Sequence, residues 1–229
     1  MAKTKKLYLN GHGYTYVHPD TFGQALHLKG IFLHSNNLKI IELGTFNGLD
    51  QLKHLYLSSN NIISIHPQIL TGLFNLKFFS LYKNELTSID EDIFLGLINL
   101  TDLWLSWNKL ISIPTTLFNG VPNITRLYLS MNKLASIDPE CFKGLFNLKV
   151  LDLSSNRLVE FQNDTFKDLL KLKIMMLQSN ELKHISENLF VNLIKLKKLF
   201  IGNNPVSLSN PTDSVELIKK VIPKCSIKL

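Results

Sequence analysis

Cysteine is scarce in this sequence of 229 residues: Cys141 and Cys225 are the two, and they stand far apart. Small secreted domains held by disulfides carry many closely spaced cysteines, and cysteine metal sites need close pairs. The sequence predicts neither, and it indicates a reducing compartment. With 45% hydrophobic residues the chain can build a sizeable core without such cross-links.

Long apolar runs are also missing. A membrane-crossing helix needs about 18 or more consecutive apolar residues, and a signal peptide has an apolar stretch near its start. Here the chain begins MAKTKK and continues in a patterned segment, so we expect neither. The net charge of +7 and the pI near 9.3 would permit nucleic acid or an anionic membrane as partner. Net charge constrains steering and solubility more than partner identity.

The sequence has no glycine-rich phosphate loop, no paired-carboxylate site and no metal-ligand cluster. No histidine is predictably beside Cys141, and His34 and His54 lack a nucleophile at a useful spacing. His18 and His66 each precede a proline and indicate turn chemistry. We therefore predict a protein that is not an enzyme and that uses no cofactor and no metal.

What the sequence does contain is a period of 24 residues. Asparagine recurs at that spacing, at Asn36, Asn60, Asn84, Asn108, Asn132, Asn156, Asn180 and Asn204. Leucine-like residues stand three and five positions before each asparagine, further apolar residues two and five positions after it, and a phenylalanine near ten positions after it. Leu70 takes the phenylalanine position once. Such self-similarity is typical of a solenoid.

Physical chemistry explains each choice within the repeat. The alternation L-x-L predicts a short strand with its leucines on one side, which is the inside. A buried asparagine at the following turn can satisfy backbone groups that the bending chain would leave unpaired. Phenylalanine and leucine on the return limb fill the interior, so each coil buries its apolar residues only when it stacks on a neighbour.

The pattern L-x-L-x-x-N-x-L-x-x-I followed by F-x-x-L-x-x-L resembles the leucine-rich repeat family in its 24-residue form. The resemblance implies an α/β solenoid, a horseshoe with a parallel sheet on its concave face and an irregular, 3-10 or short helical convex limb. We predict one domain over 1–229: a worn repeat over 1–30 with His12 in the asparagine position, regular repeats over 31–204, and a cap over 205–229. In the cap, Asp213 or Ser214 is a candidate N-cap of a short helix with Val215, Ile218 and Ile222 on one face, which would cover the end of the core.

Both tryptophans lie in the segment LWLSWN, residues 103–108. If Leu103 and Leu105 point inward, then Trp104, Ser106 and Trp107 are left on the concave face. Four residues before each asparagine an aromatic stripe crosses the sheet, in the order Tyr8, Phe32, Tyr56, Ser80, Trp104, Tyr128, Asp152, Met176, Phe200. Aromatic residues suit strand surfaces without any partner, so the stripe alone does not require one.

The two positions just before each asparagine are mostly serine. Four residues depart from that background, namely Tyr82, Lys83, Trp107 and Met131. Together with their neighbours they form a cluster of exposed aromatic, methionine and arginine side chains, the composition of an interface hot spot. The predicted partner-binding residues are Trp104, Trp107, Tyr82, Lys83, Asp102, Arg126, Tyr128, Met131, Tyr56, Phe32 and Asp152.

A lysine row offers a competing hypothesis. Seven residues before the asparagines stand Lys5, Lys29, Lys53, Lys77, Thr101, Thr125, Lys149, Lys173 and Lys197. A basic row beside aromatic residues is typical of proteins that bind single-stranded nucleic acid. The row changes to threonine at the tryptophan repeat and the next one, which favours a protein partner.

We predict a non-enzymatic module, monomeric, that binds one protein partner in its concavity. The absence of cysteine-rich caps and the Lys, Asn and Ile rich repeats are similar to leucine-rich repeat effectors of intracellular bacteria, which implies a role in occluding or recruiting a host protein. That predicts a location in the cytoplasm or in a host cell reached by a non-classical route. A fragment of an extracellular receptor is the alternative, in which the sequons at Asn99, Asn123 and Asn163 would be glycosylation acceptors.

Overall fold

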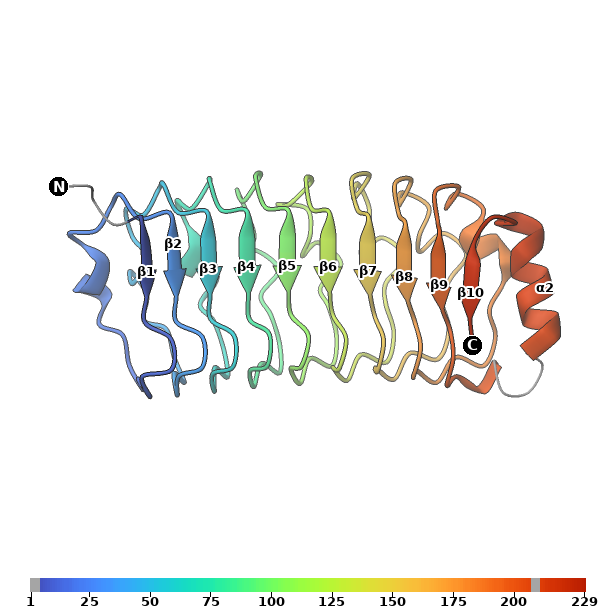
Figure 1. Ribbon diagram of the computed structural model, residues 1–229, viewed down its shortest axis with the longest axis horizontal. Coiled ribbons are helices and arrows are strands. Elements are labelled where there is room, and N and C mark those ends of the chain that lie inside the picture. The colour runs from blue at the N-terminus through green and yellow to red at the C-terminus, as the bar shows by residue number, and fades with distance from the viewer. Residues whose placement is uncertain (1–4, 207–210) are drawn as a thin grey trace.

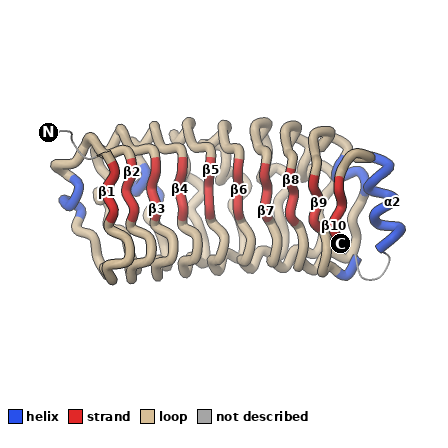
Figure 2. The backbone as a smooth tube through the Cα atoms, in the orientation of Figure 1, coloured by secondary structure: helices blue, strands red, loops and turns tan. Residues whose placement is uncertain are grey.

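The strands of the protein form one parallel sheet in chain order. The computed structural model describes residues 5–206 and 211–229, and in that part of the chain the sheet has ten strands. Figures 1 and 2 show them side by side along the solenoid, with the connecting turns at the two long edges. The strands are β1 (Lys6–Tyr8), β2 (Gly30–Phe32), β3 (His54–Tyr56), β4 (Phe78–Ser80), β5 (Asp102–Trp104), β6 (Arg126–Tyr128), β7 (Val150–Asp152), β8 (Ile174–Met176), β9 (Lys198–Phe200) and β10 (Ser226–Lys228).

Equivalent residues of successive repeats face each other across this sheet. Leu103 of β5, for example, pairs with Phe79 of β4 and Leu127 of β6. Leu103 and Leu105 are both fully buried, as the L-x-L alternation predicts. Full burial of a leucine side chain stabilises the folded state by roughly 1.5–3 kcal/mol, but here only while the neighbouring repeats are in place.

The repeated asparagines form the hydrogen-bonded ladder that the sequence predicts. Asn108 is representative: its Nδ2 donates to Leu81 O at 2.9 Å and to Leu105 O at 3.0 Å, and its Oδ1 accepts from Leu86 N at 3.1 Å. Each asparagine therefore satisfies its own turn and links it to the preceding repeat. Even the worn first repeat is tied in, since Asn36 Oδ1 accepts from the backbone N–H of His12.

Phenylalanine rings stack along the interior behind the sheet. The Phe118 and Phe142 centroids lie 6.2 Å apart, and those of Phe142 and Phe166 6.0 Å apart. Leu70 occupies the same position and is buried too. The convex limb is turns and short 3-10 helices: η1 (Pro19–Phe22), η2 (Pro67–Leu70) and η3 (Glu187–Phe190).

His18 is the N-cap of η1 and His66 is the N-cap of η2, which confirms the turn role predicted for both histidines. The Nδ1 of His18 accepts from Asp20 N at 3.1 Å, and the Nδ1 of His66 accepts from Gln68 N at 3.2 Å. Each histidine side chain thus caps the helix that its following proline starts.

At the C-terminal end the solenoid is closed by helix α2 (Pro211–Val221) and strand β10. The N-cap prediction was wrong, because Asp213 and Ser214 lie inside this helix. Proline at the start of the helix lacks an N–H that would have no intrahelical partner there. Ile218 is buried as predicted, and Val215 is half-buried. In the described residues no helix has the length and apolar character that crossing a membrane requires.

Candidate functional site

An aromatic ladder crosses the concave face of the first six repeats. It consists of Tyr8, Phe32, Tyr56, Phe78, Trp104 and Tyr128. From Tyr8 to Phe78 the rings stack face to face, with centroids 4.4–4.7 Å apart and planes within 25°. At Trp104 the geometry changes to tilted and edge-on, 5.5 Å from Phe78 and 5.1 Å from Tyr128. The ladder therefore ends in rings whose faces are not covered by parallel neighbours.

Phe78 is a ladder residue that the sequence analysis missed. Four positions before its asparagine this repeat has Ser80, which is fully buried. Phe78 stands at the other end of the same three-residue strand and is half-buried. Residues two positions apart in a strand share a face, so Phe78 can fill the gap left at Ser80. This alternation was the feature of the sequence that could have predicted the place of Phe78 in the ladder.

The position directly before each asparagine has a left-handed backbone. Its φ angles lie between 52° and 59° at every repeat, where the residues are Ser35, Ser59, Lys83, Trp107, Met131, Ser155, Ser179 and Asn203. This conformation costs an L-residue roughly 1–2 kcal/mol, and short polar side chains tolerate it best. Lys83, Trp107 and Met131 are therefore bulky or long side chains placed at strained positions of three consecutive repeats.

Both tryptophans face solvent on the concave side. Trp104 is 36% exposed and Trp107 is 47% exposed, and the Tyr82 ring meets Trp104 edge-on at 6.5 Å. Ser106 does not join them: the prediction of its exposure was wrong, since it is 4% exposed. The Ser106 hydroxyl instead contacts the equivalent serine of the next repeat: it accepts from Ser130 N at 3.1 Å.

Asp102 and Arg126 form an ion pair between β5 and β6. The Asp102 side chain is 8% exposed and the Arg126 side chain 54% exposed, so Arg126 offers the larger surface to a partner. Thr101 Oγ1 also donates to Asp102 Oδ2 at 2.7 Å. The hydrogen bond to Asp102 raises the pKa of the Arg126 guanidinium, against the lowering effect of burial. Asp102 positions Arg126, which is the group that can reach a partner.

Two ladder phenols have raised pKa values. Burial is the main cause at Tyr56 and at Tyr128, and the negative charge of Asp102 adds to it, while Arg126 opposes the shift at Tyr128. Both phenols are therefore protonated at neutral pH and can donate hydrogen bonds. Asp152, the last predicted site residue of this surface, is half-buried and accepts from Ser154 N at 3.0 Å.

The cluster that the structure brings together consists of Tyr82, Lys83, Trp104, Trp107, Arg126, Tyr128 and Met131, on three adjacent repeats. Its side chains offer apolar faces, one guanidinium, one ammonium and neutral phenols. Phe32 and Tyr56 extend it toward β1. Such a surface can bind a partner by apolar contact with charge-assisted hydrogen bonds.

The cysteines are not part of this surface. Cys141 is 2% exposed, and burial, with the charge of Asp138, raises the pKa of its thiol to about 12. Cys225 is buried as well, and burial raises the pKa of its thiol. Both thiols are protonated at neutral pH, and a protonated thiol is a poor nucleophile.

A concave parallel sheet, an asparagine ladder and a phenylalanine spine with one coil every 24 residues define a leucine-rich repeat solenoid. The family model for "Leucine rich repeat" matches residues 2–62, 53–110, 98–158 and 146–206, and the chain belongs to this family. A comparison with curated protein sequences gives no match.

Several solved structures share the fold. The structure of TLR13 in complex with ssRNA13 is 29% identical with a TM-score of 0.82, covering 87% of this chain and 28% of that one. Drosophila Toll in its glycosylated complex with Spatzle is 23% identical with a TM-score of 0.83, covering 97% and 31%. The leucine-rich repeat domain of APL1B is 23% identical with a TM-score of 0.70, covering 88% and 65%. This chain thus spans about a third or less of the TLR13 and Toll chains.

Proposed function

We propose that the chain binds one heterologous protein partner on its concave face, with Trp104 and Trp107 at the centre of the contact. The observation that supports this proposal most is the left-handed backbone of the residue before each repeated asparagine. We call these residues the left-handed row. Strained backbone conformations that persist tend to cluster at binding sites, and bulky side chains raise their cost. The placement of Trp107 and Met131 in that row is unfavourable for folding, so a benefit from binding accounts for it.

The face-to-face stacking of the ladder rings from Tyr8 to Phe78 disfavours nucleic acid as the partner. Single-strand binders offer free aromatic faces to the bases. In this chain the faces of Phe32, Tyr56 and Phe78 are stacked on one another. RNA is nevertheless the second candidate, because TLR13 with ssRNA13 is among the similar structures and the lysine row is real.

Two settings remain for the protein partner. None of the similar structures named above is a bacterial effector, so occlusion or recruitment of a host protein stays a hypothesis, as does a location in the cytoplasm or a host cell. Drosophila Toll binds Spatzle, which favours a receptor-type fragment as the alternative. The burial of both cysteines suits either compartment, because buried thiols are protected from oxidation and exchange.

Affinity capture with four proteins tests the proposal: the wild type, Trp104→Ala/Trp107→Ala, Arg126→Ala, and Ile63→Ala/Ile111→Ala as control. Ile63 and Ile111 are 53% and 64% exposed, and each stands three residues after a repeated asparagine, outside the strands. Proteins and RNA are both identified in the captured material.

A protein retained by the wild type and the control but lost with the tryptophan variant would support the proposal. Loss of a hot-spot anchor weakens binding by about 2 kcal/mol or more. Equal capture by all four proteins would move the binding surface elsewhere. Capture of RNA that depends on Trp104 and Trp107 would replace the protein partner by the second candidate.

A further inference from the structure

A row of exposed apolar side chains runs along the turns that lead into the strands, the upper edge of the solenoid in Figure 1. We call it the edge row. It repeats every 24 residues, and Asp50 is its one polar member in the sequence. The edge row consists of Leu26, Asp50, Phe74, Ile98, Pro122, Phe146, Leu170 and Ile194. Phe74 is 56% exposed, Phe146 49% and Ile194 79%.

The edge row is held rigidly. A second asparagine ladder donates to its backbone: Asn99 Nδ2 bonds Phe74 O at 2.8 Å and Asn123 Nδ2 bonds Ile98 O at 2.9 Å. A side chain added at Gly96 would come within 3.3 Å of the Phe74 ring, so that ring lies against the next repeat. The exposed apolar side chains thus recur along the edge, interrupted at Asp50, and groups of exposed apolar side chains mark interaction sites.

Lysines flank the C-terminal part of the edge row. Two positions of each repeat lie between the edge row and the strand, one directly after the edge-row residue and one three residues after it. In the last two repeats both positions are lysine. We call these four lysines, together with Lys224 of the segment that follows α2, the edge lysines: Lys171, Lys173, Lys195, Lys197 and Lys224, all exposed. Adjacent strands lie about 4.8 Å apart, so these like charges are close neighbours.

Among the described residues none of the edge lysines forms an ion pair with a carboxylate, whereas Lys143 and Lys167 of the convex limb both pair with Glu140. Lys171 Nζ donates to Asn147 Oδ1 at 2.8 Å, which is a neutral acceptor. Like charges gathered without counter-charges repel each other and are stabilised by an external anion.

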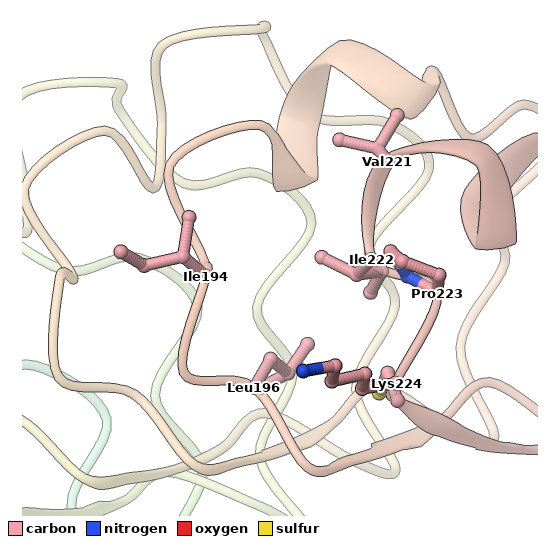
Figure 3. Close-up of a pocket in the computed structure, with 7 residues that line it drawn as sticks. Ile194, Leu196, Val221, Ile222, Pro223 and Lys224 are labelled. Atoms are coloured by element: carbon pink, nitrogen blue, oxygen red, sulfur yellow. The ribbon is translucent and has the colours of Figure 1, made fainter.

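A pocket opens between the edge row and the segment that follows α2. Its volume is about 280 Å³, and it is lined by Ile194, Leu196, Val221, Ile222, Pro223, Lys224 and Cys225. Figure 3 shows the Lys224 side chain extending across it toward Leu196. A second cavity of about 430 Å³ shares Ile194, Leu196 and Lys224 and adds Lys173, Lys195 and Lys197. One cavity is apolar and its neighbour is cationic.

From this arrangement we infer that the edge row and the edge lysines dock the protein on the surface of an anionic phospholipid bilayer. The edge row enters the boundary between headgroups and acyl chains, and the edge lysines bind the headgroup phosphates. Surface-bound helices use the same combination of an apolar stripe flanked by lysines. A strip that runs along many repeats fits an extended surface better than it fits a small ligand.

This docking leaves the concave face free, so a membrane-bound molecule can still hold its partner. It also excludes sugar at two sequons, because Asn99 and Asn123 lie beside the edge row and a glycan on either would separate it from the lipid. Membrane docking and glycosylation of these two asparagines are therefore alternatives.

Vesicle co-sedimentation tests the inference. The unglycosylated full chain is mixed with vesicles of phosphatidylcholine alone or with added phosphatidylserine. The variants are Lys195→Glu/Lys197→Glu, Phe146→Ser/Ile194→Ser and, as a control with the same charge change on the opposite edge, Lys39→Glu/Lys183→Glu. Thermal midpoints confirm that all variants are folded.

We expect the wild type to bind only the phosphatidylserine vesicles, less at high salt. The Lys195→Glu/Lys197→Glu variant should bind about tenfold or more weaker, since each surface lysine contributes roughly 1 kcal/mol. Phe146→Ser/Ile194→Ser should also weaken binding, and the control and Trp104→Ala/Trp107→Ala should bind within about twofold of the wild type.

Four results would overturn the inference. These are no binding to phosphatidylserine vesicles at low salt, an equal loss in the opposite-edge control, and binding unaffected by Phe146→Ser/Ile194→Ser, which would indicate a soluble polyanion such as RNA. The fourth is a native protein with glycans at Asn99 or Asn123, read by mass spectrometry. None of these results depends on whether the concave face binds a protein.

Discussion

At the scale of single residues the fold depends on side chains that satisfy backbone groups at bends. Each repeated asparagine is buried and binds backbone atoms of two repeats, while the residue before it takes a left-handed conformation. These two adjacent positions have opposite tolerances. The asparagine cannot be replaced without leaving polar groups unpaired. The residue before it would have less backbone strain as glycine, which adopts a positive φ without a steric penalty.

Replacing Asn108 by alanine is expected to lower the free energy of unfolding by about 1–3 kcal/mol, the cost of one unpaired buried backbone group. Leu86 N loses its acceptor, whereas Leu81 O and Leu105 O each lose one of two donors, because they also accept from Asn84 and Asn132. Chemical denaturation measures the change. Asn61→Ala serves as control. Asn61 is exposed, so its replacement should change the free energy of unfolding by less than about 0.5 kcal/mol. Equal losses in the two variants would contradict the ladder's role.

Replacing Trp107 by glycine is expected to leave the free energy of unfolding unchanged or to raise it by up to about 1 kcal/mol, because glycine relieves the left-handed strain. Partner binding should nevertheless fall by about 2 kcal/mol or more. Ser59→Gly is the matched control, with the same backbone change away from the cluster and no loss of binding. A marked drop in the thermal midpoint of Trp107→Gly would show that this ring supports the fold.

At the scale of elements, neighbouring repeats are joined by contacts outside the sheet as well. On the convex limb Glu140 accepts from Lys143 Nζ at 2.8 Å within its own repeat and from Lys167 Nζ at 2.7 Å in the next. These two hydrogen bonds lower the pKa of the Glu140 carboxyl to about 2 from an ordinary value of 4.5. The pair therefore links two coils through a group that acid can neutralise.

The sign of the pH dependence follows from this lowered pKa. The folded state holds Glu140 ionised more strongly than the unfolded chain does, so its contribution to stability is present above about pH 4.5 and is lost as the pH falls toward about 2. NMR titration of the carboxyl should give a value near 2 in the wild type and a value near 4.5 in Lys143→Ala/Lys167→Ala. An unchanged value in that variant would mean that the lysines are not the cause.

At the scale of the whole molecule, the solenoid has no single centre, because each coil contacts only its neighbours. Stability at each end then depends on the cap that covers the last coil. At the C-terminal end β10 pairs with β9, and Ile201 N donates to Lys228 O at 2.9 Å. Gly202 lies directly under this strand, and a side chain there would come within 2.4 Å of the Leu229 backbone.

Gly202→Ala is therefore expected to displace β10 while leaving the other coils folded. Hydrogen exchange should show lost protection at the Ile201 amide, with protection at Leu105, in the centre, retained. Gly23→Ala is a suitable control, because the nearest atom to a side chain there is at 3.5 Å. Uniform loss of protection along the chain would contradict the local, neighbour-by-neighbour character of the fold.

The sequence by itself determined the period, the strands, the inward leucines, the asparagine ladder and the phenylalanine spine. It could do so because each of these repeats every 24 residues, and a solenoid turns a sequence period directly into a spatial row. It also placed Trp104 on the face opposite the inward leucines, since strand alternation fixes which face a side chain takes.

Only the tertiary structure decided what lies between rows and at bends. Phe78 joined the ladder from a different row, Ser106 became buried against Ser130 of the next repeat, and Asp102 became buried where it pairs with Arg126. Side-chain size, hydrogen bonding and ion pairing act between repeats rather than along the sequence. The left-handed backbone before each asparagine is set by the bend of the stacked coil, and it gives Trp107 its strained position. The strand β10 arises because the last open sheet edge pairs with whatever segment returns to it, a long-range contact that no period announces.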